Sequence, residues 1–272
     1  MPADERSPAP ASVDFSALYD GHPDYVARRA TGSFEQAQID IEVRLFKLPQ
    51  LMRLLAPLRS VSSMSSMSSV LEIGCATGEL IAAVPVARGG RKVGMDISAA
   101  NVAAARSRFP EVEFRCGDFR DVRGETFDVV IMSDVLEHVP DDETFLRDAA
   151  ALGDTVLVNL PLEDNWLNRH RAYGPDDVSG HLRRYSLADG LALFERAALD
   201  VTSFAQVWVH ETATEAARRA LRRERQGAQY AGAWPQRAMK HAVFATAVAV
   251  PAIGRRLFAS NLFAAARRRS AT

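Results

Sequence analysis

Residues 70–80 read Val70-Leu71-Glu72-Ile73-Gly74-Cys75-Ala76-Thr77-Gly78-Glu79-Leu80. The apolar residues before Gly74 predict a short strand, and residues 79–84 predict the start of a helix. A glycine-bearing turn between a parallel strand and a helix is where open α/β sheets bind nucleotides, because the helix start offers unpaired N–H groups. Residues without side chains let the backbone approach such a ligand. This stretch therefore predicts an α/β fold with a nucleotide-like ligand.

The spacing of these glycines distinguishes between kinds of nucleotide site. A dinucleotide fingerprint needs three glycines, as G-x-G-x-x-G, whereas this loop reads Glu72-x-Gly74-x-x-x-Gly78. The pattern resembles the first motif of class I S-adenosylmethionine-dependent methyltransferases. For this loop taken alone, a tight strand-to-helix connection with no ligand is the alternative.

A second strand is predicted over residues 91–96, and it ends in Asp96, 22 positions after Gly74. This is close to the spacing of about 20 at which an acid meets ribose hydroxyls in such folds. A carboxylate accepts hydrogen bonds from two vicinal hydroxyls. We expect Ser98 to cap the helix over residues 99–109, which leaves Asp96 for the ligand, although Asp96 could itself be a cap.

Two further strand ends strengthen the resemblance. Residues 112–119 end in Gly117-Asp118-Phe119, and methyltransferases of this type hold the adenine with Gly-Asp-Phe at this place, although Gly-Asp is also a common turn pair. Residues 127–132 form an apolar, β-branched run typical of a strand buried on both faces. The sequence Asp134-Val-Leu-Glu-His-Val-Pro140 follows and resembles the fourth motif, which places residues 133 and 134 beside the amino-acid end of the cofactor.

The resemblance implies a Rossmann-like α/β fold with a seven-stranded, mainly parallel sheet, an antiparallel last strand and helices on both faces. It also implies S-adenosylmethionine as the cofactor and S-adenosylhomocysteine as the product. The cofactor-binding residues predicted in this way are Glu72, Gly74, Cys75, Thr77, Gly78, Asp96, Ile97, Asp118, Phe119, Ser133, Asp134 and Tyr25. No metal-ligand spacing appears, so no metal is predicted.

The chain is expected to divide into several parts around this core. They are a disordered lead-in (1–14), a helical lid (15–59), a Ser-rich linker (60–69), the cofactor-binding core (70–209), a basic and apolar helical insertion that covers the acceptor pocket (210–259), and the last strand with a tail (260–272). In related enzymes a helical segment before the core folds over the cofactor. Tyr19 and Tyr25 are candidates to reach the methionine carboxylate, with packing as the alternative.

The polar loop at residues 161–186 is the predicted acceptor side, because it follows the fifth strand at the ligand-binding edge of the sheet. Histidine titrates near neutral pH and can take a proton from an acceptor. The candidate catalytic residues are His181, His138 and Tyr185. The alternatives are that His138 fastens the turn after the fourth strand, and that Arg183, Arg184 and Tyr185 fasten the loop to the sheet.

Composition bounds the rest of the prediction. The chain has 272 residues, 47% hydrophobic and 25% charged, which suits a single globular α/β unit with additions. Two cysteines are too few for a disulfide framework and favour a cytoplasmic location. Residues 211–272 hold 12 Lys and Arg against 3 Asp and Glu, so this part is expected to face an anionic acceptor or, less favoured, an anionic membrane surface through residues 238–258. The apolar run there is too short for the roughly 20 residues of a membrane span.

The predicted function is methyl transfer from S-adenosylmethionine to oxygen, nitrogen or carbon of a small molecule, such as a natural product, sugar or lipid-linked compound. A regulatory protein that binds the cofactor without catalysis is one alternative, and a nicotinamide-dependent oxidoreductase is another. A nucleic-acid acceptor is not expected, because Ser133-Asp-Val-Leu stands where a base-flipping enzyme has Asn-Pro-Pro-Tyr or Asp-Pro-Pro-Tyr.

Overall fold

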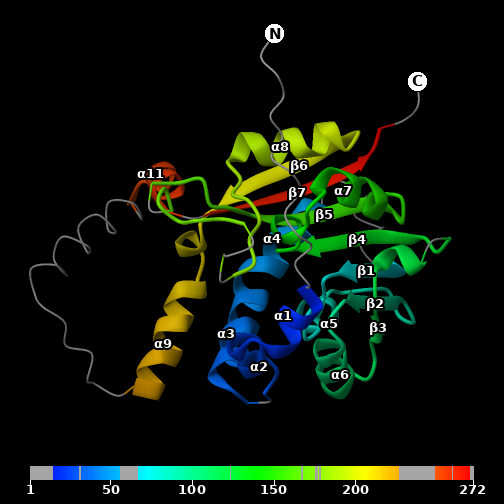
Figure 1. Ribbon diagram of the computed structural model, residues 1–272, viewed down its shortest axis with the longest axis horizontal. Coiled ribbons are helices and arrows are strands. Elements are labelled where there is room, and N and C mark those ends of the chain that lie inside the picture. Colours follow the sequence, from blue (N-terminus) through cyan, green and yellow to red (C-terminus); the bar gives the residue numbers. More distant parts are fainter. Residues whose placement is uncertain are drawn as a thin grey trace, which may run out of the picture.

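The computed structural model describes residues 15–30, 32–55, 67–122, 124–166, 168–174, 177, 179–226, 249–258 and 260–269 (Figure 1). The predicted lead-in and most of the Ser-rich linker lie outside these residues. The strands are β1 (Ser69–Ile73), β2 (Arg91–Asp96), β3 (Glu113–Cys116), β4 (Phe127–Ser133), β5 (Gly153–Leu162), β6 (Leu199–Val207) and β7 (Ser260–Arg268).

The seven strands form one sheet in the order β3-β2-β1-β4-β5-β7-β6. Strand β7 runs antiparallel to its neighbours β5 and β6, and the other neighbouring strands pair in parallel. This confirms the predicted fold class, including the last strand at residues 260–268. The chain leaves β1 towards β2 on one side and later returns to β4 on the other, so the carboxyl ends of β1 and β4 flank a topological switch point. Open α/β sheets bind ligands in the crevice at such a point.

Both faces of the sheet are buried, as the apolar β4 sequence predicts. On one face Val130 and Met132 join a core cluster with residues of α7 (Asp142–Ala150) and α8 (Leu187–Arg196). On the other face Val129 and Ile131 join a second cluster with residues of α4 (Leu48–Leu55), α5 (Glu79–Ala83) and α6 (Ala99–Arg108). Successive strand residues point to opposite faces, which is why one apolar run supplies both clusters.

The segment before the sheet is helical in its described part. It consists of α1 (Phe15–Gly21), α2 (Pro23–Arg29), α3 (Phe34–Glu42), a π-helical turn η1 (Val43–Lys47) and α4. Ser33 caps α3 by accepting a hydrogen bond from the N–H of Gln36. Figure 1 shows α1, α2 and α3 grouped together beside the sheet, whereas α4 packs against β7. The π turn inserts extra backbone between two α-helices and so changes which side chains face the sheet.

The part between β6 and β7 is described at its two ends. It comprises a short 3₁₀ turn η6 (Val209–Glu211), the helix α9 (Thr214–Gln226) and, after residues outside the description, α11 (Pro251–Leu257). Helix α9 lies beside α3 (Figure 1), where Arg218 forms an ion pair with Glu42. The ring of Trp208 stacks on Phe258 with centroids 5.1 Å apart, which joins the two ends of the segment.

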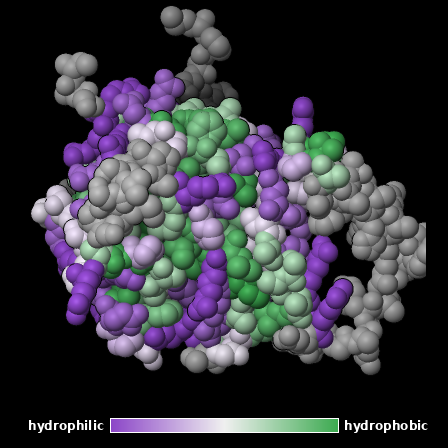
Figure 2. Space-filling view, turned by 180° about the vertical axis from the view of Figure 1, so that it is seen from behind, coloured by the Kyte–Doolittle hydropathy of each residue, from purple (hydrophilic) through white to green (hydrophobic). Residues whose placement is uncertain are grey.

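The described helices include none that is both long and apolar enough to cross a membrane. Figure 2 shows the face turned away from the view of Figure 1, where hydrophilic and apolar residues lie intermingled. On the described part of this face, no broad uniformly apolar surface is evident in the figure.

Candidate functional site

A cavity of about 800 Å³ lies at the carboxyl ends of β1, β2 and β4. Its volume is within the range of small-molecule and cofactor sites. Strand-end loops form its floor, and residues of α2, α3 and η1 form its roof. Most of the residues predicted for the site line this cavity: Tyr25, Glu72, Gly74, Cys75, Thr77, Asp96, Ile97, Asp118, Phe119, Ser133, Asp134, His138 and His181. Gly78 and Tyr185 are not among the lining residues.

The two glycines of the first loop both adopt left-handed backbone conformations, with φ of +74° at Gly74 and +87° at Gly78. A Cβ atom on Gly74 would lie 2.6 Å from a methyl carbon of Val135, and one on Gly78 would lie 2.6 Å from the Phe114 ring. These glycines are therefore required by the turn and by neighbouring side chains. At Gly78 the missing side chain makes room for Phe114, and a cofactor contact of its backbone stays a prediction.

Asp96 ties the first loop to the start of α6. One carboxylate oxygen accepts a hydrogen bond from the N–H of Ala76 (2.8 Å), and the other accepts one from the N–H of Ser98 (2.9 Å). Ser98 caps α6 through the N–H of Asn101, as predicted. Asp96 is thus held by the protein on both oxygens. Its Oδ1 also accepts from the side-chain amide of Asn101 at 3.4 Å, whereas Oδ2 keeps a second lone pair that can accept from a ligand hydroxyl.

Glu72 lies at the end of β1 with only 3% of its surface exposed. Its Oε2 atom has no hydrogen-bond partner among the described residues. Burial raises the pKa of Glu72 to about 8, although Lys47 and the N–H of Ile81 oppose this. A buried carboxyl oxygen without a partner is costly, so a ligand that donates a hydrogen bond here would be stabilised.

Asp118 and Phe119 differ in environment although they are neighbours. The side chain of Asp118 is 51% exposed at the cavity rim and forms an ion pair with Arg120 at 3.1 Å. Phe119 is buried, and its ring packs edge-on against Phe145 with centroids 4.6 Å apart. This part of the cavity therefore offers one exposed acceptor beside an apolar wall.

Lys47 is a functional candidate that the sequence reasoning missed. Its ammonium group lies 2.6 Å from a carboxylate oxygen of Asp134 and 3.2 Å from one of Glu42. Burial alone would lower the pKa of Lys47, but these two carboxylates raise it above its ordinary value. Asp134 is held in a left-handed conformation with φ of +57°, and the amide of Asn159 donates to both Asp134 and Ser133. The pairing fixes the roof of the cavity to the end of β4.

The tyrosines of the lid also line the cavity. Tyr19 and Tyr25 contact each other edge-on with ring centroids 4.9 Å apart. Burial raises the pKa of Tyr19 above its ordinary value, so its hydroxyl stays protonated and can donate a hydrogen bond. The ring of Tyr19 lies 6.1 Å from that of His138, which places the lid over the predicted acceptor side.

The three candidate catalytic residues separate into two groups. The rings of His138 and His181 lie 4.8 Å apart at the cavity wall. Nδ1 of His138 contacts the carbonyl oxygen of Gly180 at 2.9 Å, and Nδ1 of His181 contacts Glu163 at 2.6 Å. The Gly180 contact joins the turn after β4 to the polar loop, which agrees with the alternative of a fastening role for His138.

Tyr185 lies in the core instead. It is 3% exposed, and its hydroxyl donates to a carboxylate oxygen of Asp142 at 2.6 Å. Arg183 pairs with the same carboxylate at 2.7 Å, and Arg184 pairs with Asp164 at 3.3 Å. The placement of Tyr185 contradicts a catalytic role because its hydroxyl is bonded away from the cavity, and these residues fasten the loop.

Comparisons with known proteins match this core. Residues 71–153 match the family model described as "Methyltransferase domain". This match lies within the part of the chain whose motifs resemble class I S-adenosylmethionine-dependent methyltransferases, and it agrees with that resemblance.

A ubiquinone biosynthesis O-methyltransferase from Rhodopseudomonas palustris (strain HaA2) is 37% identical to this chain over 106 residues. The match covers 36% of this chain and only 41% of that relative. Among solved structures, one that superposes on this chain is magnesium protoporphyrin IX methyltransferase from Synechocystis PCC 6803 with bound S-adenosylhomocysteine. The TM-score is 0.55 at 16% identity, and the match covers 93% of this chain and 98% of that one. The [4+2]-cyclase SpnF superposes with a TM-score of 0.50 at 17% identity, covering 81% and 80%. At these identities the structures support the fold.

Proposed function

We propose that this protein is an S-adenosylmethionine-dependent methyltransferase that acts on a small-molecule acceptor. The observation that carries the proposal is that the residues matched by the methyltransferase family model are the ones whose strand ends form the 800 Å³ cavity. When bound, S-adenosylmethionine supplies a methyl group from a sulfonium, and the electron pair of the broken C–S bond stays with sulfur.

The chain's own residues fit this cofactor. The unpartnered Oε2 of Glu72 can accept a hydrogen bond from an ammonium group, which is the kind of donor that an amino acid moiety carries. Oδ2 of Asp96 keeps a lone pair for a ribose hydroxyl. Asp118 stands at the rim beside the Phe119 wall for a base with an exocyclic amine. We propose these three acids as the cofactor-binding set, with the Lys47–Asp134 pair closing the roof over it.

We propose His138 and His181, and not Tyr185, as the residues that act at the acceptor end. Both line the same cavity as the cofactor-binding acids. The Nδ1 contacts of both imidazoles fix the orientation of their rings, and we propose that Nε2 is the atom of each ring that acts on the acceptor. Positioning of the acceptor in line with the methyl donor, with water excluded by the lid, would supply most of the rate enhancement.

Several finer predictions remain part of the proposal. Arg28 and Arg218 line the cavity and favour an acceptor bearing phosphate or carboxylate. The contact of Arg218 with Glu42 supports the view that residues 210–259 cover the acceptor pocket. Peripheral membrane contact through residues 238–258, the oligomeric state and a cytoplasmic location stay predictions. Oxygen is the acceptor atom named for the ubiquinone biosynthesis relatives, and we propose it here.

The two alternatives are less well supported. A nicotinamide-dependent oxidoreductase would need a third glycine in the first loop, which reads Gly74-x-x-x-Gly78. A regulatory protein without catalysis would not need the cavity-facing histidines. The superposition on a cyclase makes clear that the fold alone does not decide the reaction.

Calorimetric titration with S-adenosylhomocysteine, with NADH as the control, tests the cofactor. We expect saturable binding of S-adenosylhomocysteine alone. Acceptors with anionic groups would then be screened for S-adenosylhomocysteine release from S-adenosylmethionine. Binding of NADH alone, or of neither compound, would contradict the proposal.

A further inference from the structure

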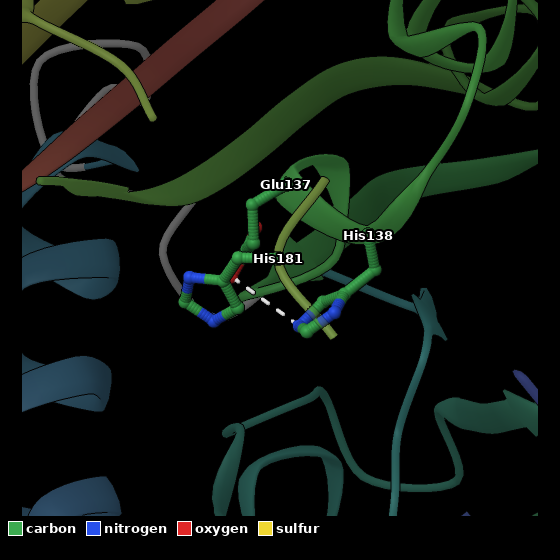
Figure 3. Close-up of side chains that lie close together, drawn as sticks. All are labelled: Glu137, His138 and His181. Carbon is green, nitrogen blue, oxygen red and sulfur yellow. Dashed lines mark ion pairs between the residues drawn. The ribbon is translucent and has the colours of Figure 1, made fainter. Parts of the chain in front are cut away.

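Three potential metal ligands meet at the acceptor end of the cavity (Figure 3). Glu137 and His138 come from the 3₁₀ turn η5 (Leu136–His138) after β4, whereas His181 comes from the loop between β5 and α8. Each offers one ligand atom, and these atoms lie within 4.8 Å of one another. The sequence predicted no metal because 43 positions separate His138 from His181, and only the fold brings them together.

The hydrogen bonds of the two imidazoles select the tautomer that a metal requires. The carbonyl oxygen of Gly180 can only accept, so Nδ1 of His138 carries the proton in their 2.9 Å contact. Nδ1 of His181 likewise donates to Glu163, which is itself held by Arg171 at 2.6 Å. In each neutral ring the lone pair is then on Nε2. A histidine whose Nδ1–H is bound to a carboxylate or carbonyl is the usual arrangement around a metal.

Glu137 supplies an independent observation. It is 1% exposed, and neither of its carboxylate oxygens has a hydrogen-bond partner among the described residues. Its Oε1 lies 3.7 Å from Nε2 of His138, which is longer than a hydrogen bond. A buried carboxylate without a partner is costly, and a cation between Glu137 and the two imidazoles would remove that cost.

We propose that Glu137, Nε2 of His138 and Nε2 of His181 bind one divalent transition-metal ion of the Zn²⁺ class. Two imidazoles and one carboxylate are a ligand set of catalytic zinc sites, which keep a fourth position open. Ligand bonds of about 2.0–2.2 Å require the three side chains to close by roughly 1 Å from their present separation. The open position would face the cavity.

This inference rests on the proposed function and refines its acceptor. A hydroxyl group that occupies the open position loses its proton to water more readily, because the ion stabilises the resulting oxygen anion. The acceptor would therefore be a hydroxyl compound, and His181 would hold the ion instead of taking the proton. Acceptors with two neighbouring oxygens would bind more tightly than those with one.

The test is metal binding by the full chain without any affinity tag, after treatment with a chelator and with no cofactor present. Co²⁺ is titrated and followed by its visible absorption, and Zn²⁺ is then used to displace it. We expect one ion per chain. Glu137→Gln and His181→Gln should weaken binding by at least about 100-fold, and Glu163→Gln by about 10–100-fold because it only orients His181. His170→Gln, in the same loop but exposed, is the matched control and should bind as the unchanged protein does.

Binding of S-adenosylhomocysteine by the same proteins separates this inference from the proposed function. If the unchanged protein binds S-adenosylhomocysteine but no ion, or if Glu137→Gln binds Co²⁺ normally, the metal site is refuted while the cofactor stands. If the ion binds and S-adenosylhomocysteine does not, the proposed function fails instead. If a variant fails to fold, NMR of the unchanged protein provides the test. Bound Co²⁺ should broaden the ring signals of His138 and His181 because the ion is paramagnetic. Unbroadened signals would refute the site.

Discussion

The burial of Glu72 predicts that the protein loses stability as the pH rises, and that Glu72→Gln removes this loss. Glu72 is 3% exposed at the end of β1, and its Oε2 lacks a partner among the described residues. Burial raises the pKa of this carboxyl from its ordinary 4.5 to about 8. Glutamine has nearly the same shape and carries no charge at any pH, so it keeps the packing and removes the titration.

The sign and size of the effect follow from linkage between protonation and folding. Between pH 4.5 and 8 the folded state holds a proton that the unfolded state has lost, so the free energy of unfolding falls as pH rises. The free energy of unfolding falls by about 1.4 kcal/mol for each pH unit between the unfolded-state and folded-state pKa values. Over the whole interval this amounts to about 5 kcal/mol. Lys47 and penetrating water would reduce it, and we expect a fall of about 2–5 kcal/mol.

The assay is urea unfolding of the cofactor-free protein at pH 5, 7 and 9. Glu72→Gln should match the unchanged protein at pH 5 and exceed its free energy of unfolding by a few kcal/mol at pH 9. Glu195→Gln, which removes an exposed acid of α8, is the control and should leave the pH dependence as it was. Parallel curves for the unchanged protein and Glu72→Gln would refute the argument, because Glu72 would then be charged at little cost.

Three further substitutions probe the rest of the cavity. Asp96→Ala should weaken S-adenosylhomocysteine binding about 100-fold in calorimetry, because the charged hydrogen bond from the ribose to this carboxylate is lost. Unchanged affinity would show that the ribose lies elsewhere. Lys47→Met leaves the half-buried carboxylate of Asp134 without its cation and should lower the free energy of unfolding by about 2 kcal/mol in urea. A gain in stability would contradict a fixing role. Tyr185→Phe loses the hydrogen bond to Asp142 and should lower the free energy of unfolding by about 2 kcal/mol, with no change in cofactor affinity. If the variant instead kept its stability and lost cofactor affinity, Tyr185 would belong to the binding site.

The sequence predicted the position of those candidate site residues that lie at the ends of strands. Glu72 and Asp96 lie at the ends of apolar strands and Asp118 lies just after one, and parallel strands bring their carboxyl ends to one edge of the sheet. Their placement in one cavity was therefore predictable from spacing along the chain. The antiparallel direction of β7 was implied by the resemblance to the methyltransferase family, and the apolar residues near position 260 indicated where that strand lies.

Other features depend on contacts that spacing does not encode. Lys47 enters the cavity because a π turn shifts the side chains of an otherwise ordinary helix, and a helical hydrophobic pattern carries no sign of that turn. Tyr185 looked like an acceptor-side hydroxyl, but its aromatic ring is better accommodated in the core, where Asp142 satisfies the hydroxyl. The approach of His181 to His138 depends on how the polar loop folds back to the turn after β4.

The charge of the cavity favours one kind of cofactor over another. Eight acids line it, against four cations (Arg28, Lys47, Arg120 and Arg218). Burial raises the pKa of three of these acids, Glu72, Asp96 and Glu137. Carboxylates that share a poorly solvated space repel one another and favour ligands that bring positive charge. The ammonium and sulfonium groups of S-adenosylmethionine bring that charge, whereas the pyrophosphate of a nicotinamide cofactor would add negative charge to it. The same field would favour a divalent cation beside Glu137, so the cofactor and metal proposals follow from one electrostatic property of the site.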